Sequence, residues 1–184
     1  YVAGRLLMME AEREVFHSRN FSYGDFSKTI NHMVELGLYD ERLLTYSKEE
    51  LDQIAPLIDI DRDMVYDYAG ANMLVNRIKH EGKTYELPQE TFMAISMMLA
   101  LNEEPGETRV NIVKEFYNAL SLRKLSLATP MLANLRVPNG NLSSCFITAI
   151  DDNIESIFYN IDSLARISKN GGGVGVNVSR IRAK

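Results

Sequence analysis

The chain is poor in the residues that build disulfides and zinc sites: it has one cysteine, Cys145, and three histidines among 184 residues. A single cysteine excludes an internal disulfide, and this set of residues leaves little for zinc, so we expect no metal site. There is no basic block and the net charge is −5, which gives no support for nucleic-acid binding. No run approaches the roughly 18 apolar residues that span a bilayer, so we expect no membrane segment. A reducing cytoplasm is the simplest setting.

The length allows one domain or part of a larger one. The chain starts at Tyr1, already inside a helical pattern, and its last residues follow an apolar alternation without a closing element. We therefore expect a piece of a longer polypeptide.

Residues 1–125 predict a mainly helical region. Apolar residues recur at helical spacing from Val2 to Val15 and again from Phe26 to Leu36. Ser47 to Glu50 have the form of a capping box, and Pro88 stands at the first turn of an apolar segment that should be buried.

The pattern changes at Ser126. Residues 125–141 predict extended chain and loop, and residues 143–150 a buried strand. An amphipathic helix and then a glycine turn with a second strand follow. A strand, a helix and a strand in this order predict a βαβ unit with parallel strands. The fold class is therefore α+β, with a helical region over 1–125 and the opening of an α/β domain over 126–184.

Acidic residues alternate at Asp59, Asp61 and Asp63, as in a calcium loop. The sixth position should be glycine and is Met64, and the twelfth should be glutamate and is Gly70. A polar helix start is the better interpretation.

Three consecutive glycines, Gly171 to Gly173, invite a phosphate-loop interpretation. No Lys-Ser/Thr follows, and the glycines lie after a helix and before a strand, the reverse of the dinucleotide-binding order. A helix stop needs only one of them. A close approach of a ligand to the backbone stays open as a second role.

Three further residues have both a structural and a functional interpretation. Asp152 can be an N-cap with Glu155 completing the box, and Lys169 suits the helix dipole. Cys145 in an apolar strand is most often a small core residue, yet Ser143 and Ser144 beside it could bind a polar ligand. A cysteine hydrolase would need a histidine base, and all three histidines lie in the helical half without a recognisable pattern.

Several segments together resemble the large, catalytic subunit of ribonucleotide reductase. "LSLATPMLANLR", "NLSSCFI", the acid-led helix and "SKNGGGVGVNVSRIRA" match that family in order and spacing. "DRDMVYDYAG" and "ETRVNIVKEFYNALS" resemble its N-terminal region, so the resemblance covers essentially the whole chain. It implies that residues 126–184 begin the family's ten-stranded α/β barrel.

The resemblance also implies roles for single residues. Cys145 matches one member of a redox-active cysteine pair, whose partner is expected beyond Lys184. Thr129 and Ser144 match positions that hold the substrate, and Gly173 matches a close backbone approach to it.

A second set of residues resembles the family's allosteric site for ATP or deoxynucleotide effectors at a homodimer interface. Asp152 matches the effector contact, and Lys169 and Arg182 match contacts to its phosphates. An anionic triphosphate beside lysine and arginine is physically sensible.

The helical region is most similar to class I enzymes, which reduce ribonucleoside diphosphates with a radical from a metal-containing small subunit. Thioredoxin or glutaredoxin would supply the external dithiol. A cobalamin-dependent relative stays open, and the segment alone is expected to be inactive. The competing interpretation is a non-catalytic helical interaction module with a truncated α/β tail, in which Cys145 is inert.

Overall fold

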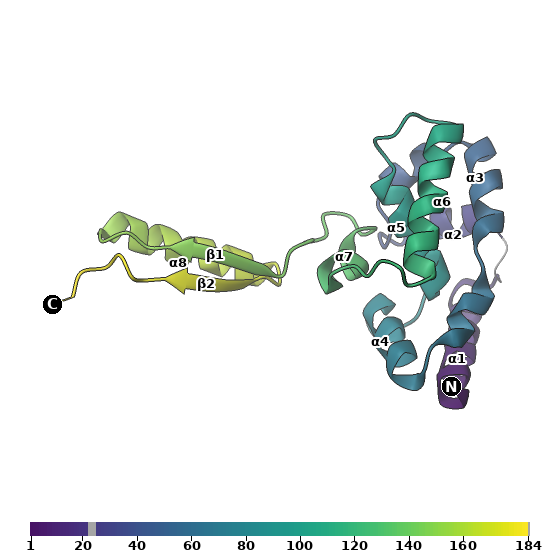
Figure 1. Cartoon of the computed structure of the whole chain (residues 1–184), viewed down its shortest axis with the longest axis horizontal. Coiled ribbons are helices and arrows are strands. Elements are labelled where there is room, and N and C mark those ends of the chain that lie inside the picture. The colour runs from purple at the N-terminus through teal and green to yellow at the C-terminus, as the bar shows by residue number, and fades with distance from the viewer. Residues whose placement is uncertain (22–24, 184) are drawn as a thin grey trace. The chain divides into compact units, whose positions relative to one another are not determined.

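The computed structural model describes residues 1–21 and 25–183 (Figure 1). The chain divides into two compact units, Tyr1–Pro138 and Asn139–Lys184. Among the described residues, no helix is long and apolar enough to cross a bilayer.

The first unit is helical, as the sequence predicts. Its elements are α1 (Val2–Arg19), α2 (Phe26–Glu35), η1 (Glu41–Thr45), α3 (Lys48–Ile54), η2 (Ala55–Leu57), η3 (Ile60–Val65), α4 (Tyr68–Ile78), α5 (Pro88–Leu99), α6 (Glu107–Ser121) and α7 (Thr129–Asn134). Between α4 and α5, His80 and Lys83 form an isolated antiparallel bridge.

The start of α3 follows the expected local chemistry. The Glu50 backbone N–H donates to Ser47 Oγ at 3.3 Å, and the Ser47 N–H donates to Glu50 Oε2 at 2.8 Å. This reciprocal pair satisfies two amide groups that the first turn of a helix leaves without partners, and the predicted capping box is confirmed.

Helix α5 is the centre of the first unit. Its residues Pro88 to Met98 are all buried, because α4, α6, η1 and η3 pack around it. The main apolar core includes Ile30, Leu43, Met93 and Tyr117. A smaller cluster between α1 and α4 includes Met8, Val15, Ala71 and Val75.

The second unit is the predicted βαβ unit. Strand β1 (Cys145–Ala149) pairs in parallel with β2 (Gly173–Asn177), and α8 (Ile154–Lys169) connects them. Cys145 lies opposite Gly173 in the register. The parallel βαβ arrangement is therefore confirmed.

Two local expectations were wrong. Strand β1 was predicted to be buried, yet Cys145 is exposed and Ile147 is 90% exposed, because α8 covers only one face of the two-stranded sheet that the structure describes. Residues 125–141 were predicted to be extended chain and loop, but Thr129–Asn134 form α7. Pro130 fits the first turn of that helix, where its missing N–H has no helical partner to lose.

Residues 126–138, assigned by sequence to the opening of the barrel, lie in the first unit.

Candidate functional site

The cysteine and the glycine turn meet at one end of the second unit. Cys145 is the first residue of β1 and Gly173 the first of β2. The Gly173 N–H donates to the Ser144 carbonyl at 2.7 Å, and Ser144 Oγ lies 3.5 Å from Cys145 Sγ. All three residues are exposed. The structure thus brings a thiol, a hydroxyl and a glycine backbone together on an accessible surface.

The three glycines have different surroundings. Gly171 has φ +79° and ends α8, which is the helix-stop role. A Cβ on Gly172 would lie 2.6 Å from Ile167 Cγ2 and 2.8 Å from Phe146 Cε2, so this residue allows the helix to pack on the strand. A Cβ on Gly173 would meet only the Ser144 carbonyl oxygen, at 3.4 Å. Packing therefore requires Gly172, while the face of Gly173 is open.

Asp152 is not the N-cap of α8, so the capping interpretation was wrong. Asn153 holds that position, and its Oδ1 accepts the Ser156 N–H at 2.7 Å. The Asp152 carboxylate instead lies 3.1 Å from Arg182 Nε. The N-cap of α8 is thus one residue further along the chain than predicted. Asn and Asp both cap helices well, so the sequence alone does not show which of two neighbouring residues is the cap.

A second ion pair lies beside the first. Asp151 Oδ1 accepts a hydrogen bond from Arg180 Nη1 at 2.9 Å. Together with the Asp152–Arg182 pair, it joins the segment that follows β1 to the segment that follows β2. Two of the three effector candidates, Asp152 and Arg182, therefore meet at the carboxyl ends of the strands.

Lys169 lies apart from that pair. It is the last residue of α8, and Asp152 precedes the first. A helix of 16 residues is about 24 Å long. Because α8 runs back from the end of β1 to the start of β2, Lys169 belongs to the end of the unit that carries Cys145 and Gly173.

Thr129 lies in the first unit, at the start of α7. Its side chain is exposed, and its Oγ1 accepts a hydrogen bond from Arg77 Nη1 on α4. Arg77 has no recognisable signal in the sequence, because it and Thr129 are 52 positions apart and no local pattern links them.

The three carboxylates considered for calcium do not converge. Asp59 Oδ2 accepts from Arg62 Nε at 3.0 Å, and Asp59 also caps η3. Asp63 is buried and accepts from Gln89 Nε2 at 2.7 Å. Over residues 1–21 and 25–183, the structure groups no three His, Cys, Asp or Glu side chains as a metal site.

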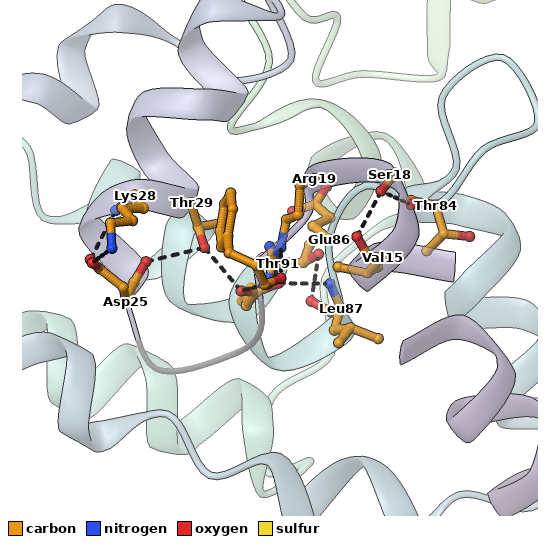
Figure 2. Close-up of polar contacts among 12 residues, drawn as sticks. Val15, Ser18, Arg19, Asp25, Lys28, Thr29, Thr84, Glu86, Leu87 and Thr91 are labelled. Atoms are coloured by element: carbon orange, nitrogen blue, oxygen red, sulfur yellow. Dashed lines mark hydrogen bonds and ion pairs between the residues drawn. The ribbon is translucent and has the colours of Figure 1, made fainter. Parts of the chain in front are cut away.

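The first unit also contains buried ion pairs that the sequence did not reveal. Arg19 donates to both oxygens of Glu90, at 3.0 and 2.8 Å, and Thr29 and the Leu87 N–H donate to the same carboxylate (Figure 2). Similar buried pairs join Arg109 to Glu50 and Arg136 to Glu86. These partners are 50 to 71 positions apart, so a pattern of local charge gives no sign of them.

The comparisons with known proteins agree with this geometry. One family model, described as the all-alpha domain of ribonucleotide reductase, matches residues 64–140. A second, described as the barrel domain of ribonucleotide reductase, matches residues 143–184.

The chain belongs to the large-subunit family of ribonucleotide reductase. A relative from Synechocystis, named ribonucleoside-diphosphate reductase subunit alpha, is 49% identical over 183 residues. These residues cover 100% of this chain and 23% of that relative. The relative from Escherichia coli, ribonucleoside-diphosphate reductase 1 subunit alpha, is 35% identical over 100% of the chain and 24% of its own length. The relative from phage T4 is also 35% identical, with the same coverage.

The chain thus spans about a quarter of the length of these reductase relatives. The helical region followed by the first βαβ unit agrees with a part of the reductase large subunit that joins the all-alpha domain to the start of the α/β barrel.

Proposed function

We propose that this chain contributes to a catalytic subunit that reduces ribonucleoside diphosphates to deoxyribonucleotides, with Cys145 as one member of a redox-active cysteine pair. The observation that carries the proposal is the exposed thiol of Cys145 at the start of β1, beside Ser144 and opposite the open face of Gly173. A substrate can approach this surface closely because Gly173 has no side chain.

The proposed reaction replaces the 2′-hydroxyl of the ribose with hydrogen. The ribose C2′–OH bond breaks, the oxygen leaves as water and a C2′–H bond forms, which consumes two electrons and two protons. Cys145 and its partner thiol supply both and become a disulfide. A third cysteine, as a thiyl radical, takes a hydrogen atom from the ribose and returns it. In this chemistry the radical originates in a metal-containing small subunit, and thioredoxin or glutaredoxin reduces the disulfide.

Thr129, Ser144 and Gly173 are proposed to hold the substrate. Two of them, Ser144 and Gly173, adjoin the thiol in the second unit. Thr129 presents an exposed hydroxyl in the first unit.

Asp152 and Arg182 are proposed to contact a deoxynucleotide or ATP effector at a homodimer interface. The geometry supports these two as one site, because their side chains already form an ion pair. An effector phosphate could replace the Asp152 carboxylate as the partner of the Arg182 guanidinium. Lys169 lies at the other end of α8, so we propose that it reaches this effector site from a second copy of the chain.

The redox proposal is tested by Cys145→Ser in the complete enzyme. Serine is nearly isosteric and cannot form a disulfide, so we expect multiple turnover to be lost while the melting temperature stays unchanged. Ser168→Ala, at an exposed serine of α8 that belongs to none of the proposed sites, serves as the control. Steady-state deoxynucleotide formation near the wild-type rate in Cys145→Ser would instead favour a non-catalytic role for this unit.

A further inference from the structure

Arg77 forms a hydrogen bond with Thr129, a residue proposed to bind the substrate. It lies in the last turn of α4, and its guanidinium donates a hydrogen bond to Thr129 Oγ1. Thr129 itself is exposed, so a ligand can reach the other side of the hydroxyl.

The helix that carries Arg77 is firmly held. Asp67 caps α4 by accepting the Gly70 N–H at 2.7 Å. The inner face of the helix is buried through Ala71, Leu74, Val75 and Ile78. Arg77 therefore extends from a fixed element, and its head group has a defined place beside α7.

The helix that carries Thr129 is held from its other end. Arg136 Nη1 donates to the carbonyls of Leu132 at 3.1 Å and Ala133 at 2.8 Å, and Arg136 Nε donates to Glu86 at 2.8 Å. Tyr39 donates its hydroxyl to the same Glu86 carboxylate at 2.5 Å. A helix of six residues does not persist alone. This buried anchor keeps α7, and with it Thr129, in position.

The hydrogen bond from Arg77 limits the further hydrogen bonds that the Thr129 hydroxyl can form. A hydroxyl has one proton to donate and two lone pairs to accept. Arg77 occupies a lone pair, so the proton remains available for a bound acceptor. The permanent positive charge of the guanidinium strengthens that donation and favours an anionic acceptor over a neutral one.

We propose that Arg77 is a positioning residue for the substrate, which orients the Thr129 hydroxyl and places a positive charge beside it, so that Thr129 donates to a phosphate oxygen of the ribonucleotide. The inference rests on the substrate-binding role proposed for Thr129.

The test measures equilibrium binding of a ribonucleoside diphosphate to the complete reductase, by dialysis and without turnover. We expect Arg77→Met to raise the Kd about tenfold, the effect of losing one charge-assisted hydrogen bond. Arg77→Lys, which keeps the charge, should recover part of the loss. Lys79→Met is the matched control, because it removes the same charge two residues further along the chain, where Lys79 faces Glu14 at 4.0 Å. Its Kd should equal that of the wild type.

A double variant separates positioning from an independent effect. If Arg77 acts through Thr129, Arg77→Met should add little to the loss already caused by Thr129→Val. Additive losses, or a normal Kd for Arg77→Met, would overturn the inference. A normal Kd for Thr129→Val would instead overturn the substrate role of Thr129. Melting temperatures are compared for all variants, and Arg77→Gln, which keeps an N–H donor and loses the charge, replaces the methionine variant if that one fails to fold.

Discussion

At the scale of single residues, Asp63 is the side chain whose burial has the clearest consequence. It is 3% exposed, and desolvation raises its pKa to about 7, with the charges of Glu90 and Glu12 acting in the same direction. The hydrogen bond from Gln89 opposes this shift without cancelling it. Below about pH 7, the folded protein therefore holds Asp63 mainly as the protonated carboxyl.

This shift predicts a pH-dependent stability. The pKa of Asp63 is raised on folding, so its stabilising effect is complete below the unfolded pKa of about 4 and is lost as the pH rises to about 7. Asp63→Asn mimics the protonated form and should flatten the decline in the free energy of unfolding between these values. Urea unfolding at a series of pH values measures it. The control is Asp61→Asn, because Asp61 is exposed; an equal flattening there would contradict the assignment.

The neighbours Asp152 and Asn153 divide two roles between them. Asn153→Ala should lower the free energy of unfolding by about 1 kcal/mol, since it removes the N-cap of α8.

Asp152→Ser should leave stability nearly unchanged, because its ion pair with Arg182 is exposed. In the complete enzyme, however, we expect Asp152→Ser to weaken effector binding and blur the choice among the four substrates. Effector titration and product ratios in a mixed-substrate assay measure this, and unchanged values would remove Asp152 from the proposed site.

At the scale of elements, two neighbouring glycines between α8 and β2 have different roles. Gly172 allows the helix to pack on the strand, and Gly173 leaves a surface open to a ligand. Gly172→Ala should destabilise the second unit by about 1–3 kcal/mol, because the new Cβ overlaps Phe146 and Ile167. Gly173→Ala should cost much less, since its Cβ fits at 3.4 Å from the nearest atom. Hydrogen exchange of the β2 amides reports both effects.

Gly173 should matter for the substrate instead. In the complete enzyme, Gly173→Val is expected to raise KM or remove activity, with a smaller change in melting temperature. Normal kinetics in the folded fraction, combined with a large loss of stability, would assign this glycine to packing alone.

At the scale of the whole molecule, the two units differ in how much apolar surface they bury. The first has a continuous core around α5, whereas in the second Ile154, Phe158 and Ile161 of α8 are 59%, 64% and 54% exposed. We therefore expect this chain to unfold in two steps rather than one. A fluorophore on Cys145 would report the unfolding of the second unit at low urea. Tyrosine fluorescence would report mainly the unfolding of the first unit, at higher urea. Coincident transitions would show that the units unfold together.

The sequence by itself determined the helices of the first unit and the parallel βαβ unit, because these depend on periodicity, prolines and capping residues that lie close together in the chain. The capping box at Ser47 and the buried helix after Pro88 are examples. Short helices were harder: α7 lies among prolines and loop residues, and its anchor, Arg136 on Glu86, joins residues 50 positions apart.

Only the tertiary structure decided which residues act together. It paired Asp152 with Arg182, gave the cap of α8 to Asn153, and placed Lys169 at the opposite end of that helix. It also brought Arg77 to Thr129 and enclosed Asp63 beside Gln89. The physical reason is the same in each case: a side-chain contact or a desolvation depends on segments that are far apart in sequence, and local pattern carries no information about which distant segments meet.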